Sequence, residues 1–326
     1  NIIYSYAYYC NYFLLEENKS HWEIVIMKTI PLHPNFGVIV DGINLDEVTN
    51  NNLYPEIRHL FEKHSAILFK DQPFSKETHI NFASLFGPLE NREAMAKNSY
   101  VKFEIPKVSN EDSDGNVFSE NDMRTLELKA NMLWHTDSTF LPIPALANII
   151  AAKTIPSSGG QTELASTRIA LKELPKNILE KIQNKKFFHS FVQSRKKIDE
   201  ELAKFHKISR WKPQEWDSII KNPVTGAESI YIASHVYQIE GMSQIDSEKV
   251  INEIICFATQ DKYVYSHDWK VGDVLIWDER SILHRGRPWP YTEPRTLASI
   301  CVSLTEKDGV PNIPTILNIK KAEVEY

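Results

Sequence analysis

His135 and Asp137 lie two positions apart in the segment from Leu133 to Phe140, and this spacing is the strongest constraint in the chain. In an extended strand, side chains two positions apart project from the same face. We therefore expect the imidazole and the carboxylate to lie side by side as two ligands of one metal ion. His284 is the candidate third ligand, and two histidines with one carboxylate are typical of non-haem iron(II) oxygenases. A His-x-Asp pair alone is common by chance, so this hypothesis depends on the rest of the sequence.

The composition is that of an ordinary globular protein. The 326 residues are 42% hydrophobic and 25% charged, with a formal charge of −6. This acidic balance gives no electrostatic footprint for nucleic acid, so no nucleic-acid partner is expected. The sequence contains neither a P-loop nor a dinucleotide-binding glycine motif. No internal repeat or low-complexity linker divides the chain, which indicates one large domain.

The cysteines and the first residues bear on the cellular setting. Cys10, Cys256 and Cys301 are far apart and form no CxxC pair. This pattern favours reduced thiols in a cytoplasmic protein, with Cys301 interpreted as a small buried hydrophobic residue.

Residues 1–26 are expected to be an extension outside the fold. Their aromatic-rich run, from Tyr4 to Leu15, has no basic region before it and no small-residue cleavage site after it, unlike a secretory signal. The run is also too short and too polar to span a bilayer, so no membrane association is expected. Met27 is the expected natural start, and residues 27–326 are expected to form a single domain.

Local patterns predict a mainly β protein with flanking helices, either a β-barrel or a jelly roll. Residues 104–124 are polar and acidic, and they are expected to form a mobile surface loop that could close over a site. Residues 193–222 could not be assigned. The sequence predicts helices at 53–64, 75–86, about 166–185 and 246–260, and strands at 66–69, 229–233, 274–277 and 298–304.

A second group of candidate residues follows the strand Val274–Trp277. His284 comes first, and Arg295 follows eleven residues later (295 − 284 = 11). A guanidinium has a fork of donors that suits the bidentate binding of a carboxylate, although a surface role is more common for an arginine. In the strand after Arg295, alternate residues form a small and polar face in phase with it, as a cavity wall would. These residues are Leu297, Ser299, Cys301 and Ser303.

These segments together resemble the taurine dioxygenase superfamily of iron(II)/2-oxoglutarate-dependent oxygenases, and within it the phenoxyacetate herbicide dioxygenases. The resemblance runs from about Leu32 to Leu304, and its motifs agree in order and spacing. The matching segments are Phe86–Glu90, Asn131–Phe140, Pro156–Glu163, Ile239–Gly241, Val271–Asp278 and Leu283–Arg287. The resemblance implies a double-stranded β-helix, the cupin-like jelly roll, with flanking helices. It also implies hydroxylation of a small-molecule substrate by dioxygen, with Fe(II) as cofactor and 2-oxoglutarate as a co-substrate converted to succinate and CO2.

The resemblance assigns roles position by position. The two histidines and Asp137 would bind iron, and no catalytic residue beyond this metal centre is implied. Arg295 would form a salt bridge with the distal carboxylate of 2-oxoglutarate, and Thr162 would help to hold it. Asn131 matches a position near the substrate. Asp137 favours oxygenation, because related halogenases lack this carboxylate. A homo-oligomer, either a dimer or a tetramer, is expected by analogy.

The substrate is where the chain departs from the family pattern. Relatives that bind a sulfonate or carboxylate substrate have a second arginine about four residues after the first, where Ser299 stands here. No arginine follows Arg295 at all, so a partner for an anionic substrate must come from elsewhere. Surface or structural roles are more common for each remaining candidate. These candidates are Arg92, Lys97, His235 and the pocket aromatic Phe140.

Two other functions are compatible with the sequence. A jelly-roll protein could keep the metal site for binding or sensing without turnover, although Arg295 and Thr162 count against that alternative. A zinc hydrolase could use the same three ligands, but it has no need of Arg295 and the sequence lacks an HExxH-type general base.

Overall fold

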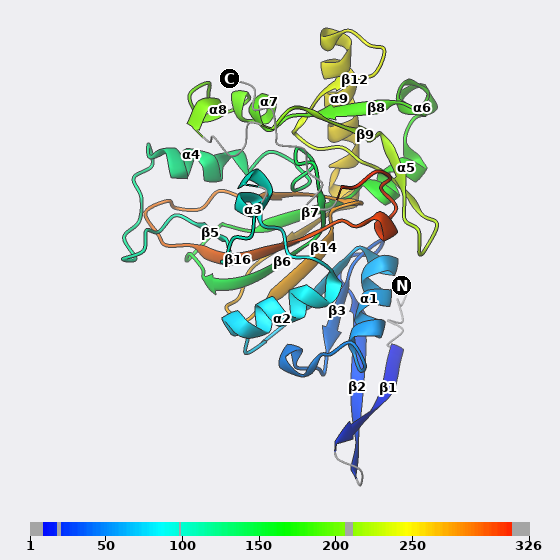
Figure 1. Ribbon diagram of the computed structural model, residues 1–326, viewed down its shortest axis with the longest axis vertical. Helices are drawn as coiled ribbons and strands as arrows, with labels where there is room; N and C mark the ends of the chain where they lie inside the picture. Colours follow the sequence, from blue (N-terminus) through cyan, green and yellow to red (C-terminus); the bar gives the residue numbers. More distant parts are fainter. Residues whose placement is uncertain (1–8, 18–20, 98, 206–210, 315–326) are drawn as a thin grey trace, which may run out of the picture.

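Helices and strands alternate irregularly along the chain, and the strands form four sheets. The computed structural model describes residues 9–17, 21–97, 99–205 and 211–314 (Figure 1). Within them, the largest sheet has eight strands, and only β3 and β4 pair in parallel. In spatial order the strands are β1 (Tyr9–Glu17), β2 (His21–Pro31), β3 (Val38–Asp41), β4 (Ala66–Phe69), β14 (Val274–Asp278), β6 (Ala145–Thr154), β16 (Thr296–Ser303) and β5 (Lys107–Ser109).

A three-stranded sheet packs against one face of the large sheet. It consists of β13 (Val264–His267), β7 (Thr162–Ser166) and β15 (Ile282–Gly286). Leu164 and Ile282 of this sheet belong to one hydrophobic cluster with Leu275 and Trp277 of β14. Because side chains alternate along a strand, His284 shares the inward face of β15 with Ile282. The candidate ligand therefore points between the two sheets.

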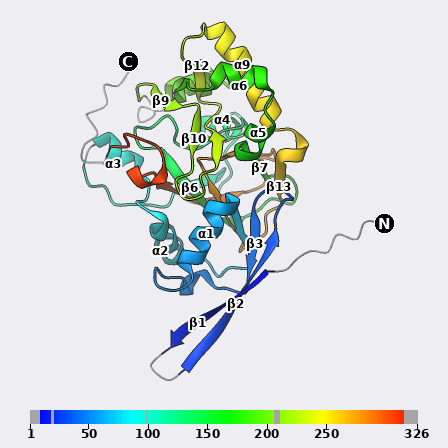
Figure 2. The same ribbon diagram turned by 90° about the vertical axis from the view of Figure 1, so that its right-hand side faces the viewer.

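Two helices cover the opposite face of the large sheet (Figures 1 and 2). They are α1 (Tyr54–His64) and α2 (Lys76–Phe86), so both predicted helices in this region are confirmed. Ser75 begins α2 by accepting a hydrogen bond from the Thr78 backbone N–H, as a capping residue does. Phe61 and Phe82 pack in the same cluster as Ile149 of β6. The central strands are thus apolar on both faces, which explains their continuous hydrophobic runs.

A third layer covers the outer side of the three-stranded sheet. It contains α5 (Thr167–Glu173), α6 (Lys176–Ile182) and α9 (Gln244–Ala258), with the small sheet β12 (Val236–Ile239), β8 (Lys186–His189) and β9 (Gln214–Asp217). The helical pattern predicted at about 166–185 corresponds to two short helices, α5 and α6. Pro175 separates α5 from α6, because the residue before a proline is disfavoured in the helical region.

Other predicted elements also differ from those in the structure. The expected loop 104–124 contains strand β5, and its end enters α4 (Met123–Ala130). The strand expected at 229–233 is only the short β11 (Glu228–Ile230), which pairs with β10 (Ile219–Lys221). The described part of the unassigned region 193–222 contains short helices and strands. They are too short for a clear hydrophobic periodicity, which is why the sequence did not predict them. Besides β9 and β10, these are α7 (Phe191–Lys196) and α8 (Leu202–Phe205). Another short helix, α3 (Arg92–Lys97), lies earlier in the chain.

Strands β1 and β2 form an antiparallel hairpin that extends away from the rest of the molecule in both views (Figures 1 and 2). Only residues 28–31 of β2 pair with β3. None of the described helices is long and apolar enough to cross a bilayer.

Candidate metal centre

His135 and His284 pair directly through their backbones. The His135 N–H donates to the His284 carbonyl at 2.9 Å, and the His284 N–H donates to the His135 carbonyl at 2.8 Å. The prediction of an extended strand through Asp137 is wrong, however. This pairing is an isolated bridge, and a turn follows at once with Ser138 at a φ of 60°. The ligands therefore converge through a bridge and a turn rather than through strand alternation.

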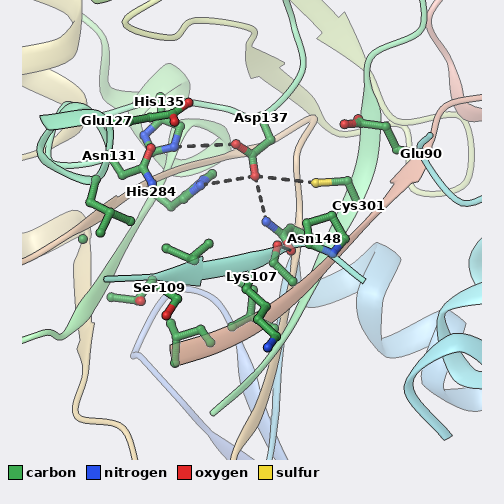
Figure 3. Close-up of a pocket in the computed structure, with 18 of the residues that line it drawn as sticks. Glu90, Lys107, Ser109, Glu127, Asn131, His135, Asp137, Asn148, His284 and Cys301 are labelled. Atoms are coloured by element: carbon green, nitrogen blue, oxygen red, sulfur yellow. Dashed lines mark hydrogen bonds and ion pairs between the residues drawn. The ribbon is translucent and has the colours of Figure 1, made fainter. Parts of the chain in front are cut away.

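The three candidate ligands meet at one point (Figure 3). Their ligand atoms all lie within 4.8 Å of one another. His135 Nε2 is 3.6 Å from Asp137 Oδ1, and His284 Nε2 is 3.6 Å from Asp137 Oδ2. Two imidazole nitrogens and one carboxylate on the same side of a cavity can occupy one face of a metal ion and leave its other positions open.

Each imidazole is held so that Nε2 faces the centre. His135 Nδ1 lies 2.7 Å from the Leu133 carbonyl, which can only accept, so Nδ1 carries the proton and Nε2 keeps its lone pair. The His284 ring packs against the Trp277 ring with centroids 4.6 Å apart. Burial lowers the pKa of His135, and burial together with His135 lowers the pKa of His284 to about 3. Both rings are therefore neutral near pH 7, as metal binding requires.

Asp137 is held in its ionised form. Burial raises its pKa, but the charges of His284, His135 and Arg92 and a hydrogen bond from Asn148 outweigh burial and lower the pKa to about 2. Asn148 Nδ2 donates to Asp137 Oδ2 at 2.7 Å. The Cys301 thiol lies 3.8 Å from the same oxygen, so Cys301 is more than the inert hydrophobic residue expected from the sequence (Figure 3).

Glu279 supports the metal centre from the side away from the cavity, and no pattern in the sequence pointed to it. Its side chain is fully buried, and burial raises the pKa of its carboxyl group well above the ordinary value. Oε2 accepts the Asp137 backbone N–H at 2.9 Å, and Oε1 accepts Trp277 Nε1 at 2.7 Å. Oε2 is also 3.8 Å from His284 Nδ1. A buried carboxyl behind a metal-binding histidine is a recurring way to orient such a ligand.

The three ligands open into a cavity of about 700 Å³. Most residues predicted for the site line this cavity: Asn131, Phe140, His235, Arg92, Ser299, Thr162 and Arg295. Lys97 is not among the lining residues, because its amine pairs with Glu93 on the surface of α3. Leu297, Ser299 and Cys301 line the cavity together, as predicted for this face of β16, but Ser303 is buried and does not line it. Residues 107–109, from the expected loop, form β5 beside β16 and also line the cavity. Movement of that loop stays a prediction.

Arg295 is buried at one end of this cavity. Its Nε and Nη2 donate to the Gly160 carbonyl at 3.1 and 2.8 Å, and its guanidinium lies 4.9 Å from the Trp289 ring centroid. Burial lowers its pKa to about 10, so it remains charged near pH 7. Arg295 forms no salt bridge with any described residue. Thr162 Oγ1, in the same cavity, accepts a hydrogen bond from Trp269 Nε1 at 3.0 Å.

A second arginine that forms no salt bridge with any described residue also lines the cavity, and nothing in the sequence pointed to it. Arg195 lies on α7, in the region that could not be assigned, and its side chain is buried. The cavity therefore presents two buried guanidinium groups that have no carboxylate partner among the described residues.

Comparisons with known proteins agree with this geometry. Residues 28–301 match the family described as "Taurine catabolism dioxygenase TauD, TfdA family". The chain is 31% identical to an α-ketoglutarate-dependent 2,4-dichlorophenoxyacetate dioxygenase of Cupriavidus pinatubonensis, over 82% of this chain and 94% of the relative. It is 32% identical to an (S)-phenoxypropionate/α-ketoglutarate dioxygenase of Sphingobium herbicidovorans, over 82% and 91%. The structure of AAD-2 in complex with Mn(II) and N-oxalylglycine superimposes with a TM-score of 0.76 at 29% identity, covering 86% of this chain and 98% of that one.

Proposed function

Because the chain belongs to the TauD/TfdA family of α-ketoglutarate (2-oxoglutarate)-dependent dioxygenases, we propose that His135, Asp137 and His284 bind one Fe(II) ion in this enzyme. The observation that carries the proposal is the convergence of their ligand atoms within 4.8 Å at the base of the cavity. The donor set fits the metal, since both imidazoles are neutral and the carboxylate is ionised near pH 7.

We assign 2-oxoglutarate to the end of the cavity that contains Arg295 and Thr162. Arg295 is charged, buried and without a carboxylate partner among the described residues, so a bound carboxylate would compensate its charge. The Gly160 carbonyl holds two of its donors and so fixes the plane of the guanidinium. The Thr162 hydroxyl can add one hydrogen bond to the same ligand.

The protein's part in the reaction is to position the metal ligands and the substrate and to exclude water. When bound, iron and 2-oxoglutarate supply the oxidising chemistry, in which dioxygen is consumed, 2-oxoglutarate becomes succinate and CO2, and the substrate is hydroxylated. Leu133 fixes the tautomer of His135, and Asn148 and Cys301 restrict rotation of the Asp137 carboxylate. Apolar lining residues such as Phe140 keep bulk water from the reacting C–H bond.

We also propose that the two facing sheets form a double-stranded β-helix and that residues 27–326 are a single catalytic domain. Support comes from the cluster that joins Leu164 and Trp277 across the sheets, and from the family match, which begins at residue 28. Residues 1–26 would then be an extension. Residues 1–8 and 18–20 lie outside the described part of the chain, and the others belong to the hairpin that extends from the body.

The substrate we propose is a small organic anion, with aryloxyalkanoates as the first candidates. The two relatives named above act on 2,4-dichlorophenoxyacetate and on (S)-phenoxypropionate, and both of these are carboxylates. The cavity combines apolar side chains, such as Phe103 and Phe118, with cationic ones. This mixture suits a molecule with an apolar body and one charged end.

The proposed function is tested by anaerobic titration of the metal-free protein with Fe(II) and 2-oxoglutarate. The wild type should develop the weak visible charge-transfer band of the iron–2-oxoglutarate complex. The Asp137→Ala variant should lose both the band and the formation of succinate in air. Unchanged succinate formation by Asp137→Ala would sink the assignment of the metal ligands.

A further inference from the structure

We propose that Arg195 binds the anionic group of the substrate, in a part of the cavity separate from Arg295. This inference rests on the proposed function, in which Arg295 is occupied by 2-oxoglutarate. It also accounts for an anionic substrate in a chain that has no second arginine after Arg295.

Arg195 is a buried charge that forms no salt bridge with any described residue. Its guanidinium makes no hydrogen bond and no salt bridge with any described residue, and its Nε is fully buried without a partner. Arg280, by contrast, is more deeply buried and pairs with Asp278 at 2.8 Å and with Glu62 at 2.6 Å. Burying a charge without a partner is energetically costly. A bound anionic ligand that pairs with the guanidinium is the simplest explanation for such an arginine.

The position of Arg195 places it beside the metal centre. Its Cζ lies 4.1 Å from the centroid of the Phe191 ring. Phe191 stacks on His235 with centroids 6.4 Å apart, and His235 lies 6.3 Å from the ring of the metal ligand His135. The charge of Arg195 accordingly contributes to the lowered pKa values of His135 and His235. A substrate anion at Arg195 would therefore be separated from the iron ligand His135 by the rings of Phe191 and His235.

None of the other described charged groups of this wall forms a salt bridge with Arg195. Arg92 is already paired with Glu90 at 2.7 Å. Glu127 lines the same cavity and its charge favours the protonated form of Arg195, but it forms no salt bridge with it. His235 is neutral near pH 7, because burial lowers its pKa well below the ordinary value.

One planar guanidinium matches one planar carboxylate. Phe140, whose ring lies 4.9 Å from Phe191, offers an apolar surface for the rest of the molecule. The substrate class is therefore a monocarboxylate with an apolar body.

The test compares an acid with its neutral amide. Phenoxyacetate and phenoxyacetamide are titrated against the anaerobic Fe(II)–2-oxoglutarate complex of the full-length protein, by calorimetry. The wild type should prefer the acid, and Arg195→Met should lose this preference by about 10- to 100-fold, the range expected for one charge-assisted interaction. Methionine keeps an unbranched apolar stem over Phe191 but removes the charge. The 2-oxoglutarate charge-transfer band should form in Arg195→Met as in the wild type.

Two further variants locate the effect. Lys97→Met removes a cation outside the cavity and should keep the preference for the acid. Arg92→Met removes the paired cation inside the cavity. If Arg92→Met abolishes the preference while Arg195→Met keeps it, the assignment to Arg195 is overturned. A wild type that shows no preference for the acid, including one that binds neither probe, also overturns it.

Thermal unfolding of the substrate-free protein separates a ligand-binding role from a structural one. Removing an unpaired buried charge should leave the Tm of Arg195→Met equal to or above that of the wild type, whereas loss of a structural arginine lowers it. A clear fall in Tm argues against the proposal. Failure of the proposed function gives a different result, because the charge-transfer band would then be missing from the wild type itself.

Discussion

The backbone N–H of Asp137 donates a 2.9 Å hydrogen bond to Oε2 of Glu279, although the two residues are 142 positions apart in the sequence. This contact ties the turn that carries one candidate ligand to the strand end that precedes another. Glu279 also lies 3.8 Å from His284 Nδ1, so one buried carboxyl adjoins two of the three ligands.

Replacing Glu279 should weaken iron binding more than it weakens the fold. Glu279→Ala leaves the donors of Asp137 and Trp277 without an acceptor, and loss of such outer support typically lowers metal affinity by about 10- to 100-fold. Glu279→Gln keeps one acceptor and should have an intermediate effect. Fe(II) titration of the three proteins measures this order. Equal affinities would show that Glu279 does not orient the ligands.

Arg295→Lys should lower the affinity for 2-oxoglutarate by about 10- to 100-fold, because a lysine keeps the charge but loses the fork of donors. The loss would appear as a rightward shift of the anaerobic 2-oxoglutarate titration at saturating Fe(II). Binding of Fe(II) alone should not change. A variant that binds 2-oxoglutarate as tightly as the wild type would remove Arg295 from the proposed site.

Gly160→Ala should also weaken 2-oxoglutarate binding, through displacement of Arg295. A Cβ at Gly160 would lie 2.9 Å from Arg295 Nε, and the residue has a φ of +71°. Gly115→Ala is the matched control, because Gly115 has a φ of +84° but no heavy atom within 4 Å of a Cβ. Both alanines should cost about 1–2 kcal/mol of backbone strain, but only Gly160→Ala should raise the KM for 2-oxoglutarate. Equal KM values in the two variants would contradict the prediction.

His189 should make the fold less stable in acid. It is fully buried with no hydrogen-bond partner for either ring nitrogen among the described residues, and burial lowers its pKa from 6.5 to about 3. Below pH 6.5 the unfolded chain binds a proton that the folded protein does not. Stability is therefore complete above this pH and is lost as the pH falls toward 3.

The contribution of His189 can be measured by urea unfolding at several pH values. Below the pKa of the unfolded state, the free energy of unfolding of His189→Phe should fall less steeply with decreasing pH than that of the wild type. The two slopes should differ by about 1.4 kcal/mol per pH unit. An unchanged slope would mean that His189 is protonated in the folded protein.

Short-range patterns in the sequence determined much of this protein. Hydrophobic periodicity and capping by Ser75 predicted α1 and α2, because both depend on neighbouring residues. The spacing of His135 and Asp137, together with the motif around His284, selected three residues that do meet in the structure. The alternation along β16 likewise predicted a polar cavity wall.

Only the tertiary structure decided how these ligands are held and what else surrounds them. The turn at Ser138 replaces the expected strand, and Glu279 and Arg195 reach the site from distant segments whose local patterns gave no sign of it. A hydrogen bond across 142 residues or an unpaired guanidinium depends on which surfaces pack together, and that is set by the whole core rather than by the spacing of neighbours.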